Sequence, residues 1–422
     1  MARLWSCGFE NQGVANGDEW DTTTGSPSID TTTKRSGAAA LRCNPTTATA
    51  FITHRCFSTS GQIFVRFFIY IATAPSADTV IFSTYQAGSA TGGFIELTTT
   101  RTLKLYEGWN GTQIGSASSA LNTGQWYMVE YSGETNGTSW TYELKLDGTS
   151  VASGSVGSTN TQTMHQILLG VGCVDKSVGT SPGGNVSADI YFDDVAVNDT
   201  TGTDQTTFAG DGKIVHLLPN GDGDNHEWLK SGGGAGDASN YQDVDETTGD
   251  DATTYVKKTS GTPIDDYALE DTASKGLNSY DTITLVQVGV KGKATSNTAA
   301  SGRDLVLRFK TQSAGTLATS ASIDYSTTAW ELHGDPVTKG YQLAVYADPQ
   351  AAGPLTPALL DSSQIGMTPN ASAANEVDIT KLWLLVEYLE GTPPVPAGPQ
   401  TLENFKHIKA GEGMAVTENS FN

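Results

Sequence analysis

Two adjacent carboxylates interrupt IYFDDVAV, an apolar run at residues 190–197. Side chains alternate between the faces of a strand, so one of Asp193 and Asp194 should point to the side of Tyr191 and the other to that of Phe192. A carboxylate that faces a protein core needs a partner. The chemistry open to it is a hydrogen bond from a backbone amide, an ion pair with a basic side chain, or coordination of a bound cation.

A second carboxylate-rich segment, GDGDNHEW, contains Asp222, Asp224, His226 and Glu227. A calcium loop of the EF-hand type starting at Asp222 would need glycine at position 227 and glutamate at position 233, where the chain has Glu227 and Gly233. We therefore interpret this segment as a solvated acidic loop. The six histidines are scattered, and their spacing predicts no zinc site.

Motifs that would indicate catalysis are missing from the sequence. Retaining glycanases need two carboxyl groups about 5 Å apart, and no E-x-D-x-E run supplies them. Glu143 and Asp147 share a strand face, but Asp147 begins a turn with Gly148. The sequence also lacks a G-x-S-x-G elbow, a phosphate-binding loop and an HExxH motif. These observations predict a protein without enzymatic activity.

The charge balance excludes several kinds of partner. Lys and Arg number 24 against 46 Asp and Glu, which gives a formal net charge of -22. Such a field repels nucleic acid and anionic membrane surfaces. Only 17% of the residues are charged, and 47 are glycine. Together with abundant Thr, Ser and Asn, this composition favours short strands and turns, so we expect an all-β protein.

The first residues, MARLWSCGFENQG, lack the apolar core of a signal peptide, and no later segment resembles a membrane span. We expect synthesis in the cytosol without export, and no membrane insertion. The four cysteines, at positions 7, 43, 56 and 173, have no metal-type CxxC spacing. They are interpreted as buried structural thiols, with a Cys7–Cys43 or a Cys43–Cys56 disulfide as the alternative.

Strand-like runs bounded by turn residues recur through the first 200 residues. They are AAALRC, QIFVRFFIYIA, TVIFSTY, GFIELTT, TLKLYEG, WYMVEYSG, WTYELKLDG, HQILLGVG and ADIYFDDVAV. Asn136-Gly137 and Asp147-Gly148 are dipeptides typical of hairpin turns. The pattern predicts an antiparallel β-sandwich over residues 1–200.

A polar connection over residues 201–212 precedes a second set of strand-like runs over residues 213–390, among them TITLVQVGVKGKA, RDLVLRFKTQ and KLWLLVEYLE. This set predicts a second antiparallel β-sandwich. Residues 391–422 begin with the Pro-rich spacer GTPPVPAGPQ and continue as a tail too short to hold a core of its own.

The first 200 residues resemble the concanavalin A-like, laminin-G-like jelly rolls, a superfamily that contains lectins, carbohydrate-binding modules and some glycanases. Four features carry the resemblance: an opening strand with Phe9-Glu10, the turn Ser36-Gly37 before AAALRC, Trp126 at the start of WYMVEYSG, and the closing strand IYFDDVAV. Their order and spacing cover nearly the whole segment.

The resemblance implies a structural calcium ion between the first and last strands. Its ligands would be Glu10 and Asp194, with backbone carbonyls from the region of Ser36 and Gly37. The alternative involves no metal: one aspartate faces solvent, and the other accepts hydrogen bonds from loop amides or pairs with Lys34 or Arg35.

The second region is similar to a domain of structural proteins from tailed bacteriophages. The opening GDGKIVHLLPNGDGDNHEW, the DYALED segment, the strand VQVGVKGKA and the closing KLWLLVEY carry this resemblance. It implies a virion structural protein, a capsid decoration, head fibre or tail-associated component, made in the host bacterial cytoplasm. We expect it to bind other virion proteins of the capsid or tail and to form homo-oligomers.

Exposed aromatic residues are candidates for two kinds of contact. Trp109 and Asn110 in YEGWNGTQIG and Trp20 in GDEWD could bind a host-surface glycan by ring stacking and hydrogen bonding. The alternative is that these tryptophans pack beneath their own hairpins or at a subunit contact. In the tail, Phe405 and Phe421 are candidate anchors to a virion partner. Glycan attachment through the first domain is therefore the second functional hypothesis.

Overall fold

The computed structural model describes residues 3–14, 19–56, 58, 61–86, 91–108, 111–135, 138–157, 163–173, 186–231, 239–258, 261–294, 304–325, 328–332, 341–370 and 377–393. Trp109, Asn110, Phe405 and Phe421 lie outside the described residues, as does the turn predicted at Asn136-Gly137. The chain up to Gly391 belongs to one compact unit, and Thr392–Asn422 belongs to another.

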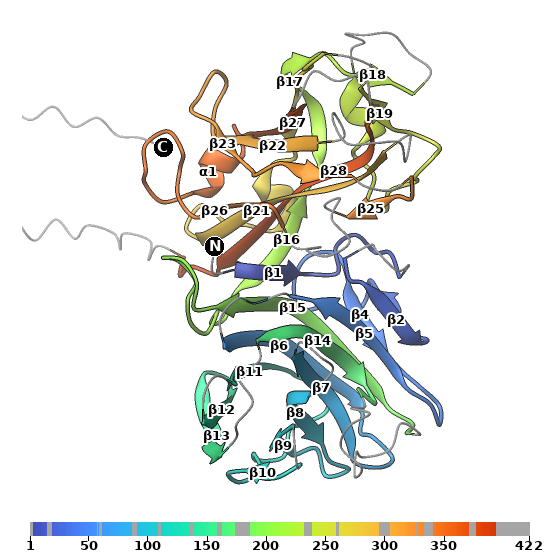
Figure 1. Ribbon diagram of the computed structural model, residues 1–422, viewed down its shortest axis with the longest axis vertical. Coiled ribbons are helices and arrows are strands. Elements are labelled where there is room, and N and C mark those ends of the chain that lie inside the picture. The colour runs from blue at the N-terminus through green and yellow to red at the C-terminus, as the bar shows by residue number, and fades with distance from the viewer. Residues whose placement is uncertain are drawn as a thin grey trace, which may run out of the picture. The chain divides into compact units, whose positions relative to one another are not determined.

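The strands coloured from blue to green in Figure 1 form a first sandwich of two sheets. One sheet contains β1 (Arg3–Cys7), β3 (Ser28–Asp30), β4 (Ala40–Cys43), β6 (Gln62–Thr73), β11 (Trp126–Glu134), β12 (Ser139–Leu146), β13 (Thr149–Gly157) and β15 (Asp189–Asp199). The other sheet contains β2 (Thr22–Gly25), β5 (Ala50–Arg55), β7 (Thr79–Gln86), β8 (Thr91–Leu97), β9 (Leu103–Glu107), β10 (Gln113–Ile114) and β14 (Met164–Val171).

Alternation along the strands explains why the two sheets pack. On β6, Ile63, Val65 and Phe67 point inward and are at most 1% exposed, in a core that both sheets build. The residues between them, among them Arg66 and Phe68, lie on the outer face of the sheet. A strand with one apolar face gains stability by burying that face against a second sheet, so this sequence forms a sandwich.

The strands coloured from yellow-green to red form a second sandwich (Figure 1). Its first sheet contains β16 (Lys213–Leu217), β18 (Leu229–Lys230), β19 (Val256–Lys257), β21 (Thr282–Ala294), β25 (Glu331–Leu332), β26 (Leu343–Val345) and β28 (Val377–Leu389). The second sheet contains β17 (Pro219–His226), β20 (Asp265–Leu269), β22 (Asp304–Lys310), β23 (Ala318–Thr319), β24 (Ile323–Asp324) and β27 (Gln364–Pro369). Three short helices complete the described residues: η1 (Asn240–Asp243), η2 (Thr272–Lys275) and α1 (Pro357–Leu360).

The predicted all-β class, with antiparallel sandwiches, is confirmed, and the strand pairs of the described residues are all antiparallel. The turn at Asp147-Gly148 is also confirmed, since both residues have positive φ (48° and 75°) and join β12 to β13. The four cysteines are buried free thiols, as the first interpretation proposed. The described part of the chain contains no helix with the length and apolar content of a membrane span.

The connection between the sandwiches packs on the outer face of the first one. Phe208 contacts the ring of Phe64 edge-on, with ring centroids 5.1 Å apart, and Lys145 Nζ lies 3.7 Å from the Phe208 ring centroid. Gly210 donates its backbone amide to the Glu130 carboxylate at 2.9 Å and accepts from Arg66 at 3.0 Å. The segment predicted as a linker is thus held in place by these contacts.

A buried ion cluster joins the sandwiches. Arg3 of β1 and Arg66 of β6 each place Nη1 2.6 Å from a carboxylate oxygen of Glu387 on β28, and all three side chains are at most 1% exposed. Burial alone would raise the pKa of Glu387, but the two arginines hold it below its ordinary value. We call Arg3, Glu387 and Arg66 the interdomain triad. It fixes charged groups of both sandwiches in one low-dielectric cluster.

The prediction of a solvated loop at GDGDNHEW is wrong about the loop, although Asp224, His226 and Glu227 are exposed. Its residues up to His226 belong to β17, which pairs with β20. Asp224 accepts hydrogen bonds from Lys310 Nζ at 2.6 Å and from Ser313 Oγ at 2.7 Å, and the bond from Lys310 lowers the pKa of Asp224. Acidic side chains can occupy this strand because neighbouring elements donate hydrogen bonds to them.

Candidate functional site

The structure brings the predicted calcium residues Glu10, Ser36, Gly37 and Asp194 together. Both oxygens of Glu10 accept the backbone amide of Ala38, at 2.8 and 3.0 Å. A Cβ atom on Gly37, whose φ is 56°, would lie 2.1 Å from Glu10 Oε1, so only glycine fits there. Ser36 Oγ donates to Asp194 Oδ1 at 2.6 Å.

A β-bulge explains how both aspartates of IYFDDVAV reach this turn. Asp194 has a φ of 49°, and the register between β15 and β6 shifts between Asp193 and Ala196. Strict alternation is therefore wrong at this position: Asp193 accepts the backbone amide of Arg35 at 2.8 Å, while Asp194 accepts Arg35 Nη1 at 2.6 Å. Both aspartates are fully buried.

Groups of the protein itself donate hydrogen bonds to these carboxylates. Asp194 also accepts the backbone amide of Ile214 at 2.7 Å, so it bonds to a guanidinium, a hydroxyl and an amide at once. Burial raises the pKa of Glu10 and of Asp193, and the adjacent Asp194 raises that of Asp193 further.

These surroundings do not fit a calcium ion. Calcium needs six to eight oxygen ligands, and the Arg35 guanidinium bound to Asp194 would repel it. Among the described residues, no group of three or more His, Cys, Asp or Glu side chains could hold a metal ion. The arrangement matches the hydrogen-bonded and ion-paired alternative, although both aspartates are buried and neither faces solvent. The calcium ion itself stays an untested prediction.

Trp20 is not an exposed aromatic, and its predicted role in glycan stacking is wrong. It is 1% exposed, belongs to the core of the first sandwich, and packs against Phe9 with ring centroids 5.7 Å apart. Its Nε1 donates to Thr23 Oγ1 at 3.0 Å. A ring enclosed in this way cannot stack on a sugar.

Partly exposed aromatic rings, unlike the ring of Trp20, lie in a row of side chains on the outer face of the first sandwich. Trp126, Tyr70, Tyr191 and Arg42 are consecutive cross-strand partners on β11, β6, β15 and β4. The rings of Trp126 and Tyr70 lie 5.4 Å apart, and those of Tyr70 and Tyr191 lie 5.7 Å apart. The guanidinium of Arg42 lies 5.4 Å from the Tyr191 ring. We call these four residues the aromatic row.

The three rings of the aromatic row differ in exposure. Trp126 and Tyr70 are half-buried, whereas Tyr191 is 6% exposed. Arg42 forms two hydrogen bonds of 2.8 Å to Asp189, which raise the pKa of Arg42. Trp126 and Tyr70, at one end of the row, are thus the rings that can meet a ligand.

An open cavity of about 340 Å³ adjoins this end, and its lining is Arg35, Phe68, Trp126, Met128, Asp147 and Asp211. The Arg35 guanidinium lies 3.4 Å from the Phe68 ring centroid, a cation–π contact. Arg35 also forms ion pairs with Asp194 and Asp211. The volume is near the lower end of the range for small-molecule sites, about 300 Å³. We call this space the Trp126 cavity.

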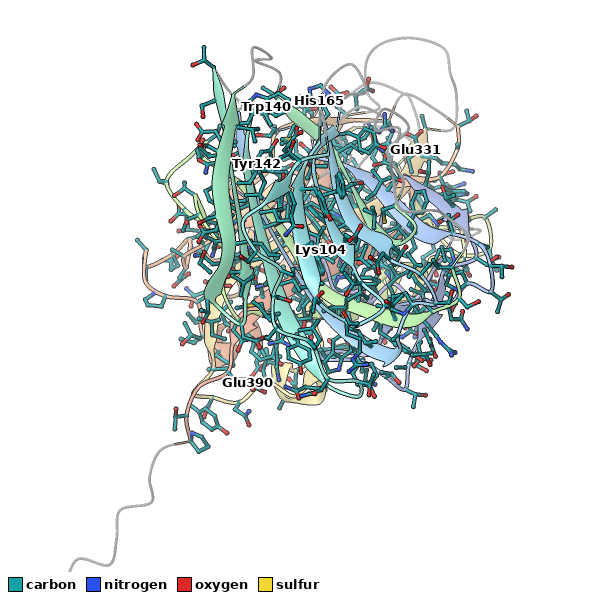
Figure 2. The ribbon with its side chains drawn as sticks, turned by 90° about the horizontal axis from the view of Figure 1, so that it is seen from below. Lys104, Trp140, Tyr142, His165, Glu331 and Glu390 are labelled. Carbon is teal, nitrogen blue, oxygen red and sulfur yellow. The ribbon has the colours of Figure 1, made fainter. Side chains whose placement is uncertain are left out.

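A second cavity of about 340 Å³ lies farther along the same sheet, toward β13. Its lining is hydroxyl-rich: Gln62, Ser132, Thr141, Tyr142, Glu143, Ser153, Gly154 and Ser155. Tyr142, labelled on β12 in Figure 2, donates its hydroxyl to the Gly92 carbonyl and is 3% exposed. The hydroxyls and the Glu143 carboxylate therefore supply most of the accessible polar groups.

These two cavities and the aromatic row were not found from the sequence. Trp126 and Tyr70 are 56 residues apart, and only the register of β11 with β6 brings them together. The available signal was the outward alternation of Phe64, Arg66, Phe68 and Tyr70 within QIFVRFFIYIA, which is unusually aromatic for a solvent-side face.

No family model matches the chain, and no curated protein matches it. Several solved structures are similar at low TM-scores. A sialidase has a TM-score of 0.32 and 13% identity over 42% of this chain and 16% of its own. The carbohydrate-binding module CBM66 from Bacillus subtilis has a TM-score of 0.29 and 12% identity over 44% of this chain and 98% of its own. The alginate lyase Aly36B has a TM-score of 0.33 and 13% identity over 46% of this chain and 96% of its own. This chain spans less than a third of the sialidase, and similarity at this level carries no functional argument.

Proposed function

We propose that the outer face of the first sandwich binds a glycan, with Trp126 as the stacking platform. The observation that carries this proposal is the cross-strand pairing of Trp126 with Tyr70 beside an open cavity. A rigid sheet holds both rings, so a sugar that stacks on them meets a preformed surface and orders few side chains on binding.

Polar groups around the ring suit the hydroxyls of a sugar. Asp147 and Asp211 line the Trp126 cavity, and the Asp211 side chain is 71% exposed. Carboxylates accept strong hydrogen bonds from hydroxyl groups. The hydroxyl-rich second cavity on the same sheet supports binding of a chain longer than one sugar.

We propose binding without cleavage, which keeps the non-enzymatic role expected from the sequence. Incubating the protein with each polysaccharide that it binds should release no reducing ends. Trp126-dependent release of reducing ends would contradict this part of the proposal.

Trp126→Ala should weaken glycan binding at least about tenfold, a loss of about 1.4 kcal/mol. The alanine removes the stacking surface. The fold should be retained, because Trp126 lies at the start of a strand and is only half-buried. Binding is measured on an array of bacterial capsular and O-antigen polysaccharides, and affinities for the hits are measured by calorimetry.

Trp330→Ala is the matched control, because Trp330 is also a half-buried tryptophan but belongs to the second sandwich. Lys293 Nζ lies 4.5 Å from the centroid of its ring. It should leave the affinity unchanged. If Trp126→Ala binds as tightly as the native chain, or if the native chain binds no polysaccharide on the array, the proposal is wrong.

As a second function we propose a structural role in the virion of a tailed bacteriophage. The resemblance of the second region to phage structural proteins is its origin. Attachment would use the capsid or the tail as partner.

Quantitative mass spectrometry of gradient-purified, nuclease-treated particles tests the virion role. We expect this protein at a fixed ratio to the major capsid subunit. A high ratio would indicate a capsid decoration or fibre, and a low ratio a component of the tail. Absence from purified particles would contradict the proposal and leave glycan binding as the remaining function.

A further inference from the structure

The Trp126 cavity contains one cationic side chain, and its charge is already neutralised. Arg35 Nη1 donates to Asp194 at 2.6 Å and to the Gly212 carbonyl at 2.9 Å, while Nη2 donates to Asp211. The face of the guanidinium is covered by Phe68. Arg35 therefore offers an incoming anion neither a free N–H pair nor an unpaired charge.

Two other arginines near the site also have carboxylate partners. Arg66, whose guanidinium lies 6.0 Å from the Phe68 ring centroid, is buried and pairs with Glu387. Arg42, at the far end of the aromatic row, forms a two-point ion pair with Asp189 through Nε and Nη2. It therefore carries little net charge toward a ligand on Tyr70 or Trp126. An anionic sugar on the aromatic row would find no uncompensated cation among the described residues of the row and the Trp126 cavity.

Two carboxylates face the same cavity. Asp211 is 71% exposed, and Asp147 is exposed at the turn between β12 and β13, where its Oδ1 accepts the Met128 amide at 2.9 Å. Each retains acceptor capacity for a ligand, since a carboxylate has about four acceptor positions. The groups that can contact a ligand here are thus a ring face and hydrogen-bond acceptors.

We propose that the Trp126 cavity selects uncharged, hydroxyl-rich glycans and rejects glycans that carry carboxylates, with Asp147 and Asp211 as the residues that determine this specificity. The inference rests on the proposed glycan-binding function and names its ligand class. Hydroxyl groups donate to the two aspartates, whereas a ligand carboxylate is repelled by them and cannot donate. The net charge of -22 adds a long-range repulsion of the same sign.

The probe is a neutral polysaccharide from the array and the same polymer after oxidation of its primary hydroxyls to carboxylates. The native chain should bind the neutral polymer at least about tenfold more tightly than the oxidised polymer. The double variant Asp147→Asn and Asp211→Asn should lose most of this preference. Asparagine suits the positive φ of position 147, so the turn is retained.

The control double variant, Asp78→Asn with Glu390→Gln, removes the same charge from exposed positions outside the cavity. It should keep the preference, which separates a local effect from the field of the whole protein. Equal loss of preference in both double variants would overturn the assignment to Asp147 and Asp211.

The failure of this inference differs from the failure of glycan binding. Array hits confined to carboxylate-bearing polysaccharides, and lost in Trp126→Ala, would overturn the charge selectivity while supporting the platform. Absence of any hit would overturn both. Neutral hits with a preference that survives the control substitutions and disappears in Asp147→Asn with Asp211→Asn would support the proposal.

Discussion

Glu387→Ala is expected to lower the free energy of unfolding by about 3–5 kcal/mol, enough to unfold a marginally stable protein. The substitution leaves Arg3 and Arg66 buried, at most 1% exposed, without the carboxylate that lies 2.6 Å from each. An unpaired buried charge costs far more than the net contribution of the pair itself. Urea denaturation followed by tryptophan fluorescence measures the loss.

Glu390→Ala is the matched control, three residues farther along the chain. Glu390 is 61% exposed and pairs with Lys213, so its removal should cost at most about 1 kcal/mol. Similar losses in Glu387→Ala and Glu390→Ala would contradict the importance of the interdomain triad.

Acid gives a second readout of the same cluster. The pKa of Glu387 is lower in the folded than in the unfolded chain, so the unfolded chain binds more protons. The stability that Glu387 contributes is therefore complete above about pH 4.3, the ordinary pKa of glutamate, and disappears as the pH falls through its folded value. We expect Glu390→Ala to retain this acid-dependent loss of stability.

The fold class could be predicted because it depends on local patterns. Strand-like runs bounded by turn residues are visible in the sequence, and so is the Asp147-Gly148 turn. Burial of the apolar face against another sheet follows from alternation alone, whatever the order of the strands.

The bulge at Asp194 could not be predicted in the same way. A positive φ at one residue reverses the alternation that the prediction assumed, and aspartate adopts this conformation without a sequence marker such as glycine. The pairing with Arg35 was accessible only as one of several alternatives, and the hydrogen bond from Ser36 was not predicted, because both join residues about 160 positions apart.

Trp20 and Trp126 illustrate the limit for binding residues. Trp20 has polar neighbours in GDEWD and so suggested exposure, yet it packs on Phe9 inside the core. Trp126 was noted only as the first residue of a strand, yet it lines a cavity. Residue type and near neighbours do not fix which face of a sheet a ring occupies, and the register across β11, β6 and β15 is a long-range property.

Asp194→Ala is the second substitution for which we expect a large effect. The Asp194 carboxylate accepts from the Arg35 guanidinium, the Ser36 hydroxyl and the Ile214 amide, all within 2.7 Å, and it is fully buried. Alanine would leave these three donors without an acceptor, and it tolerates a φ of 49° less well than aspartate does. Asp147→Ala is the control, because Asp147 has a φ of 48° but lies exposed at a hairpin turn. Both variants replace an aspartate by an alanine at nearly the same left-handed φ, so they share the difference in backbone cost between these two residues.

Asp147→Ala also removes one hydrogen bond, from the Met128 amide, so the difference between the two variants measures how much more the buried bonds of Asp194 contribute than that single bond. We expect Asp194→Ala to be less stable than Asp147→Ala by about 3 kcal/mol or more, as measured by urea denaturation. Asp194→Asn should fall between Asp194→Ala and the native chain, since an amide oxygen can still accept from Ser36 and Ile214 but does not neutralise Arg35. If Asp194→Ala and Asp147→Ala were equally stable, the strain of the bulge, and not the bonds to Asp194, would account for the loss. The carboxylate in the middle of IYFDDVAV would then not be what connects the turn at Ser36 to the start of β16.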